Sequence, residues 1–192
     1  MSLGYWETLA VGTDGTALTA IARASMLQGA TGKTGLYTLG ANALRVNDVL
    51  HIRASGRISC AVTTPGTARF DLSFGVAGTA CMDTGAISLN IVAKTNVGWI
   101  LEMEGVVKAI GNAGNIMWQG FWLSEASINT AAAATGPGPG GNVQPFNAAP
   151  AVGSNVDMTV ANILDFNFTQ TVNTGSCQCH NYVLSKKTAT GF

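Results

Sequence analysis

The sequence of 192 residues is poor in charge, because only 10% of its residues are Asp, Glu, Lys or Arg. A typical soluble domain has about 25%. Ten basic and ten acidic residues give a formal net charge of zero, and neither sign is clustered. Binding to nucleic acid through its phosphates requires a basic patch. We therefore expect no nucleic-acid partner, and the lack of a polybasic segment argues equally against a membrane surface.

Long apolar runs are also missing. The longest candidate, "VGWILEMEGVVKAIG", is interrupted by Glu102, Glu104 and Lys108, whereas a membrane-spanning helix needs about 18 or more apolar residues. The N-terminal "MSLGYWETLAVGTDG" lacks the basic and apolar regions of a secretory signal. These absences predict a soluble protein made in a cytoplasm, without a membrane partner, whose four cysteines are reduced.

Residues for acid–base chemistry are few. His51 and His180 are the only histidines, and no G-x-S-x-G nucleophile motif is present. Glu102 and Glu104 lie two residues apart and could act as acid and base in glycoside hydrolysis. Such a pair more often lies on a solvated strand or meets arginines of a neighbouring strand or subunit. We therefore expect no enzymatic activity, and we assign these charges to a subunit interface: Glu102, Glu104, Arg53 and Arg57.

What the sequence does contain is alternation of apolar and polar residues, the pattern of half-buried strands. In 48–60, one face holds the apolar residues Leu50, Ile52, Ala54, Ile58 and Cys60. The same pattern recurs at 68–76, 86–92, 97–110, 157–171 and 177–185. The segment 115–124 is apolar on both faces, which indicates a central or interface strand. Turn residues predict hairpins between 48–60 and 68–76 and between 97–110 and 115–124. The prediction is an all-β fold, an antiparallel β-sandwich over residues 36–192.

Two segments depart from this pattern. Residues 1–35 form a predicted N-terminal arm, in which 17–29 is either a short helix ending at Gly29 or an extended segment. Residues 128–156 include "AAAATGPGPGGNVQPFNAAPAVG", a long loop rich in Gly, Pro and Ala. Loops of this length in a compact domain are usually functional or disordered.

The stretch "CQCH" (177–180) looks like a metal or redox site. In a regular strand, however, Cys177 and Cys179 share one face, while His180 and Tyr182 share the other. The spacing also lacks the C-x₂₋₄-C pairing that is usual for structural zinc, and free cysteine is among the most buried residue types. We predict packed cysteines, no metal and no cofactor.

Tryptophans give one further indication. Trp118 and Trp122 share a face of the strand at 115–124. Such a stripe can form a sugar-binding platform, but it more often belongs to a core or to a trimer axis. Both residues are therefore candidates for a subunit interface. A sugar platform is the basis of an alternative function.

The segments "YTLGANALRVNDVLHIRASGRIS" (37–59), "AKTNVGWILEMEGVV" (93–107), "MWQGFWLSEA" (117–126) and "CHNYVLS" (179–185), in this order, resemble small structural proteins of tailed bacteriophages. The resemblance covers 37–185 and implies a jelly-roll-like sandwich, often a homotrimer, that decorates or cements the phage head. It implies no catalytic residues. It does not account for "CQCH".

From this resemblance we expect a virion structural protein on the capsid surface, made in the host cytoplasm, with itself and the major capsid protein as partners. The N-terminal arm would anchor it, because aromatic side chains dominate interface energetics. The candidate capsid contacts are Tyr5, Trp6, Glu7 and Arg23. The alternative is a carbohydrate- or receptor-binding module of a phage tail or fibre.

Overall fold

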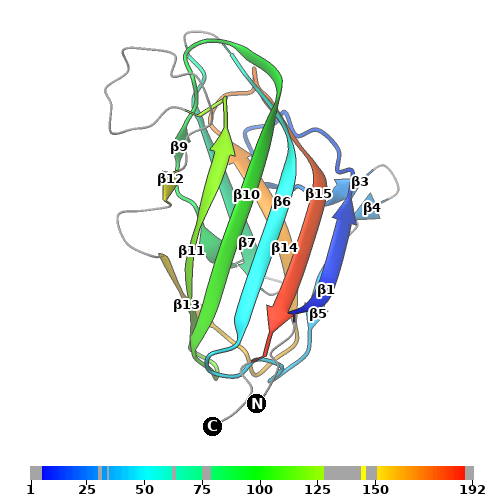
Figure 1. Ribbon diagram of the computed structural model, residues 1–192, viewed down its shortest axis with the longest axis vertical. Coiled ribbons are helices and arrows are strands. Elements are labelled where there is room, and N and C mark those ends of the chain that lie inside the picture. Colours follow the sequence, from blue (N-terminus) through cyan, green and yellow to red (C-terminus); the bar gives the residue numbers. More distant parts are fainter. Residues whose placement is uncertain are drawn as a thin grey trace.

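The computed structural model describes residues 6–29, 32–33, 35–61, 64–74, 79–127, 144–145 and 151–188. Within these ranges the chain forms strands, turns and bends, and it contains no helix. Two antiparallel sheets pack face to face as a β-sandwich (Figure 1). The predicted all-β sandwich is confirmed.

The larger sheet has seven strands, in the order β1-β15-β6-β10-β11-β12, and β13 also pairs with β11. It lies in front in Figure 1. Its strands are β1 (Trp6–Thr13), β6 (Val49–Cys60), β10 (Lys94–Ala109), β11 (Gly114–Ser124), β12 (Gln144–Pro145), β13 (Ala151–Val156) and β15 (Ser176–Lys187).

The smaller sheet has six strands, in the order β2-β14-β7-β8; β5 also pairs with β14, and β9 with β7. Its strands are β2 (Ala24–Ser25), β5 (Tyr37–Leu39), β7 (Thr67–Phe74), β8 (Thr79–Asp83), β9 (Ile87–Ser88) and β14 (Asn162–Gln170). A separate pair consists of β3 (Gln28–Gly29) and β4 (Gly32–Lys33).

The core lies between these sheets and follows the alternation of the sequence. All five apolar residues predicted to share a face of β6 are buried. Phe70 of β7 is central, because its ring centroid lies 5.3 Å from that of Trp99 and 5.7 Å from that of Trp122 in the opposite sheet. Burial of such large side chains supplies most of the favourable free energy of folding.

One predicted hairpin is confirmed and the other is wrong. Strands β10 and β11 pair as antiparallel neighbours across the turn at 110–113. Strands β6 and β7 do not pair, because β6 lies between β15 and β10 while β7 lies between β14 and β8. Both strands instead contribute buried apolar residues to the core between the two sheets. Turn residues between them fit either arrangement.

The helix considered for 17–29 is wrong, whereas the extended alternative holds for the described residues. Strand β1 pairs with β15 at the sheet edge, and the amides of Gly15 and Leu18 donate to the carbonyls of Cys179 and Cys177, both at 2.8 Å. The chain then crosses to the smaller sheet, where β2 pairs with β14. Residues 6–29 are thus built into both sheets, since the backbone groups that a helix would use bond to neighbouring strands.

Candidate interaction surface

The solvent-facing side of the larger sheet carries most of the predicted subunit-interface residues. We call it the open face, and it includes His51, Arg53 and Arg57 of β6 and Glu102 and Glu104 of β10. In the β6–β10 register, Arg53 lies opposite Glu102, and His51 lies opposite Glu104. A basic column on one strand therefore runs beside an acidic column on the next.

Two of these side chains interact within the chain. Nε2 of His51 lies 3.1 Å from Oε1 of Glu102. The ring of Trp6 lies over His51, with centroids 5.4 Å apart and planes inclined by 55°, and 45% of Trp6 remains exposed. The row Trp6, His51 and Glu102 thus crosses β1, β15, β6 and β10. The sequence offered no signal for it, because these residues come together only through strand order.

The other charged residues of the open face make fewer contacts with the described residues. Arg53 and Glu104 are exposed, and neither makes a side-chain hydrogen bond or ion pair with the residues that the structure describes. Among the residues that the structure describes, Arg57 donates only to the carbonyl of Asn96, at a long 3.4 Å. An exposed cation and an exposed anion on neighbouring strands are available to a partner.

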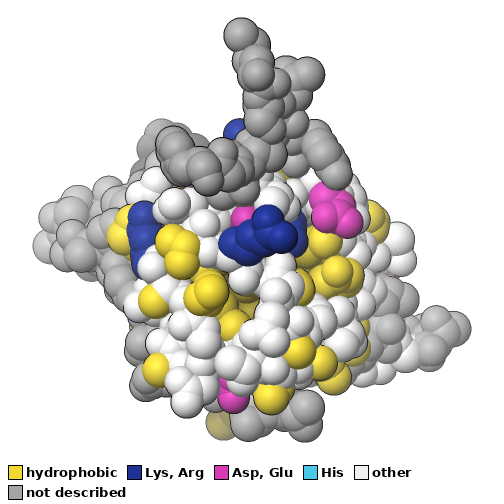
Figure 2. All heavy atoms as spheres, turned by 90° about the horizontal axis from the view of Figure 1, so that it is seen from below, with side chains coloured by type: hydrophobic (Ala, Val, Ile, Leu, Met, Phe, Trp, Pro, Cys, Tyr) yellow, Lys and Arg dark blue, Asp and Glu magenta, His cyan; other side chains and the backbone are white. Residues whose placement is uncertain are grey.

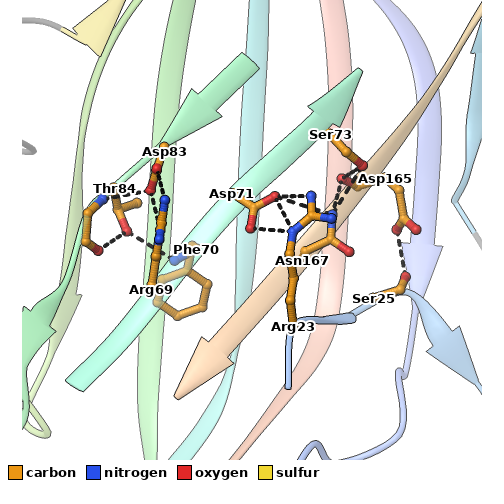
Figure 3. A network of polar contacts seen from close by, with 11 residues as sticks. Arg23, Ser25, Arg69, Phe70, Asp71, Ser73, Asp83, Thr84, Asp165 and Asn167 are labelled. Atoms are coloured by element: carbon orange, nitrogen blue, oxygen red, sulfur yellow. Dashed lines mark hydrogen bonds and ion pairs between the residues drawn. The ribbon is translucent and has the colours of Figure 1, made fainter. Parts of the chain in front are cut away.

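The candidate capsid contacts are placed differently from one another. Trp6 and Glu7 are exposed at the start of β1, and Tyr5 lies outside the described residues. Arg23 is already paired inside the chain: its Nε lies 2.9 Å from Oδ2 of Asp71, and its Nη2 bonds the other carboxylate oxygen (Figure 3). The hydrogen bonds to Asp71 raise the pKa of Arg23 above its usual value, because their effect exceeds the lowering caused by burial. Arg23 therefore has a partner within the chain, and its role as a capsid contact stays a prediction.

The pair of Arg23 and Asp71 belongs to a polar network on the outer side of the smaller sheet (Figure 3). Nδ2 of Asn167 donates to Oγ of Ser73 at 3.2 Å, and Oγ of Ser25 donates to Oδ1 of Asp165 at 2.6 Å. Asp71 is only 3% exposed. We call this side the clamped face, because Arg23 and Ser25 fasten the N-terminal segment to it.

A second ion pair flanks the clamped face. The guanidinium of Arg69 binds the carboxylate of Asp83 through both oxygens, with Nε 2.8 Å from Oδ1. Burial alone would raise the pKa of Asp83, but the hydrogen bonds from Arg69 and from the amide of Gly85 outweigh it and hold this pKa below its usual value. Both carboxylates, Asp71 and Asp83, are thus bound by arginines of the same chain.

Trp118 and Trp122 are corrected from interface candidates to core residues. Both are 0% exposed and lie between the two sheets. The six-membered part of the Trp118 indole packs on Gly105 directly across the β10–β11 pair, where an added Cβ would come within 2.6 Å of the ring. A sugar platform needs exposed rings, so these two cannot form one in the folded chain. Gly105 is a signal in the sequence for this packing, because a residue without a Cβ leaves room for a large ring on the neighbouring strand.

The "CQCH" prediction is half right. Cys177 and Cys179 share the buried face of β15 as expected. The register against β6 shifts between Cys179 and Asn181, so His180 is an extra residue in a β-bulge and Tyr182 returns to the core face. His180 instead reaches the edge, where its Nδ1 lies 2.6 Å from Oδ1 of Asp14.

The chemistry of these thiols follows from their burial. All four cysteines are free. Burial raises the pKa of Cys179 to about 12 and raises that of Cys177 well above its usual value. The thiolate is the form that attacks electrophiles and binds metals, so both thiols are inert in the folded protein. Among the described residues, no three or more His, Cys, Asp or Glu side chains are grouped to hold a metal ion.

The part of the chain that the structure describes holds no helix that is both long and apolar enough to cross a bilayer. Comparison with known proteins found no matching family model, no matching curated protein and no matching solved structure. The surfaces of this chain are therefore the basis for assigning it a function.

Proposed function

We propose that this protein is a virion structural protein that decorates and stabilises the head of a tailed bacteriophage. In this proposal a homotrimer binds the outside of the major capsid lattice, and each trimer bridges several capsid subunits. Multivalent attachment of this kind gives strong binding from individually weak contacts. The protein performs no catalysis in this role.

The open face is the observation that supports the proposal. Its basic column on β6 and acidic column on β10 are complementary to each other. In a closed ring of identical subunits, the basic column of one copy meets the acidic column of the next, and every copy uses both. Arg53 and Glu104 lack partners among the described residues, as this arrangement requires.

The alternative, a carbohydrate- or receptor-binding module of a tail or fibre, has lost the tryptophan platform that suggested it, and most of the loop at 128–156 that could also carry such a site lies outside the described residues. Its aromatic platform was to consist of Trp118 and Trp122, and both are buried. Of the four tryptophans, only Trp6 is exposed, and its ring lies against His51. We therefore favour the head protein.

The experiment that tests the proposal is analysis of purified virions of the phage that carries this gene. Quantitative mass spectrometry should find the protein at a fixed ratio to the major capsid protein, and electron cryomicroscopy should place it on the outside of the head. Absence from the virion would reject the proposal. Location on the tail or a fibre would favour the receptor-binding alternative.

A further inference from the structure

A shallow hollow of about 270 Å³ lies on the open face, near the upper end of β11 in Figure 1. Its walls include Ile100 and Leu123, which are direct partners in the β10–β11 register, and Ile100 is 38% exposed. The hollow is open because Gly98 has no side chain: an added Cβ would meet no atom within 4 Å. Six residues line it: Gly98, Trp99, Ile100, Leu123, Ser124 and Glu125.

A carboxylate stands at the edge of this hollow. Glu125 is exposed, and its Oε2 lies 3.6 Å from Nζ of Lys94, which is too long for a hydrogen bond. Exposed pairs of this kind hold their members weakly, so Glu125 can accept a second cation. Aliphatic walls with a carboxylate at the rim suit the side chain of arginine, which has an apolar stem and a cationic end.

Arg57 is the cation of the open face that matches this hollow. It lies directly opposite Gly98 in the β6–β10 register, so the two residues are at the same level along the strands. Arg57 is exposed, and its contact with the carbonyl of Asn96 is long. Rotation about an axis parallel to the strands keeps every residue at its own level. Around such an axis, Arg57 of one copy therefore meets the hollow of the next copy.

A second row of the open face is complementary in the same way. Val11 lies opposite Val183, and Val183 lies opposite Arg53. Arg53 lies opposite Glu102, which in turn lies opposite Phe121. Val11 is 56% exposed, and the other two apolar residues of the row are half-buried. When the β1–β15–β6 half of one copy meets the β10–β11 half of the next, apolar side chains meet apolar ones and cations meet carboxylates.

The contacts within the chain leave the right charges free for this arrangement. Glu102 is already bonded to His51. Glu104, the next outward residue of β10, has no such bond among the described residues. It is therefore the carboxylate that is left for Arg53 of a neighbouring copy.

The lower end of the sandwich has no comparable pattern. Figure 2 views the molecule from below and shows hydrophobic, basic and acidic side chains intermixed there. A mixed surface does not specify a partner by its chemistry. By contrast, no segment of the described residues crosses in front of β15, β6 and β10 in Figure 1. The contact between copies is therefore assigned to the open face.

We propose that Arg57 of one copy enters the hollow over Gly98 of the next copy. Its aliphatic stem lies between Ile100 and Leu123, and its guanidinium binds Glu125. This inference rests on the proposed function, because it places the contact within the homotrimer. It adds that the threefold axis is parallel to the strands of the larger sheet and that the open faces are turned toward it.

The first test fills the hollow without disturbing the fold. Gly98→Val adds a side chain in open space, and β-branched residues suit strands. In sedimentation velocity of the full-length protein over a concentration series, we expect the concentration for half-association to rise at least about tenfold, because valine occupies the space of the arginine stem. The matched control is Gly40→Val, which also adds a side chain in open space but follows β5 of the smaller sheet. It should associate like the wild type.

The second test exchanges the charges. Arg57→Glu places two carboxylates together and should weaken association by at least about tenfold as well. Combining it with Glu125→Arg should restore association. Thermal melting verifies that each variant keeps its fold.

The outcomes separate this inference from the proposed function. If the wild type is a trimer and Gly98→Val and Arg57→Glu associate like it, the inference is overturned, while a virion location would still support the head protein. If Arg57→Glu lowers the melting temperature and leaves association unchanged, Arg57 acts within its own chain, and the inference is again overturned. If both variants weaken the trimer but the protein is absent from virions, the contact stands and the head function falls. A wild type that is monomeric overturns the contact.

Discussion

The outward residues of both sheets follow the same alternating sequence pattern, but those of the larger sheet include exposed charges and those of the smaller sheet include buried polar groups. On the open face, the outward residues of β6 and β10 include Arg53 and Glu104, which are exposed. On the clamped face, the outward residues of β7 and β14 include Asp71 and Asn167, which are buried beneath the N-terminal segment. Alternation within a strand fixes which residues point outward. What covers them is decided by a segment far away in the sequence.

The difference has an energetic consequence. A buried carboxylate is tolerated only when it is paired and hydrogen-bonded, and removal of one partner leaves the other without compensation. An exposed charge can always return to water, so its pairs contribute little. Substitutions on the clamped face should therefore affect folding. Those on the open face should affect association instead.

The largest effect is expected for Asp71→Ala. Asp71 is buried, and its loss leaves the guanidinium of Arg23 and the amide of Asn167 without a carboxylate. We expect the free energy of unfolding to fall by about 3 kcal/mol, a value typical of broken buried pairs and reduced here because Arg23 is partly exposed. Urea denaturation followed by circular dichroism measures it.

The matched control is Glu104→Ala on the open face, which removes a carboxylate of an exposed residue. Its effect on the free energy of unfolding should remain within about 0.5 kcal/mol. Equal losses for the two variants would show that the two faces do not differ as described.

A smaller effect is expected for Ser25→Ala, which removes the hydroxyl bound to Asp165 at 2.6 Å. Hydrogen bonds to charged groups contribute about 1.5 kcal/mol or more, and the buried carboxylate loses a donor. Ser55→Ala, at a half-buried position of the open face, is the control and should be nearly neutral. Loss of the Ser25 contact should also increase proteolysis near residues 19–25, so limited digestion gives an independent measurement. Unchanged digestion would contradict the fastening role.

The sequence predicted the strands well because burial of one face imposes period two on each of them. The buried side of β6 and the β10–β11 hairpin both follow from this rule together with local turn residues. Strand order does not follow from it. The failed β6–β7 hairpin and the bulge at His180 each depend on which strands become neighbours, and a single inserted residue then reverses the facing of Tyr182.

The candidate surface was predictable only in part. Period two places Arg53, Arg57, Glu102 and Glu104 on outward faces, and all four lie on the open face. The same reasoning could not distinguish an exposed tryptophan from a buried one. Trp118 and Trp122 are inward residues of an amphipathic strand, while Trp6 lies at a sheet edge over His51. The pairing of Arg23 with Asp71 was not predictable, because the two residues are far apart in the sequence.

The ion pair of Arg69 and Asp83 beside the clamped face should have a smaller effect on the free energy of unfolding, and this effect depends on pH. Since the pKa of Asp83 is lower in the folded protein than in the unfolded chain, the pair with Arg69 contributes stability at pH values above the unfolded pKa of about 4. This contribution is lost as the pH falls through the folded pKa. We expect about 0.5 kcal/mol, because both groups are partly exposed.

Denaturation of the wild type and Asp83→Asn between pH 7 and pH 2 measures this contribution. The difference between the two proteins should be constant near neutrality and should vanish in acid. Arg69→Gln should reproduce the effect from the other side of the pair. A difference that persists at the lowest pH would assign the loss to packing and not to charge.

The smallest effect on stability, and the sharpest contrast between the faces, is expected for Arg53→Glu. Arg53 is exposed, so the free energy of unfolding should change by less than about 0.5 kcal/mol. Self-association should be lost, because the reversed charge would face the acidic column of a neighbouring copy. Sedimentation velocity of the wild type should show a trimer, and the variant should sediment as a monomer. Reversal of Glu104 in the same chain, Glu104→Arg, should restore association, since the charges at positions 53 and 104 are then exchanged and remain opposite between copies. If the double variant is monomeric, as Arg53→Glu alone is expected to be, positions 53 and 104 do not meet between copies. If the wild type is itself monomeric, the open face is only a solvated surface.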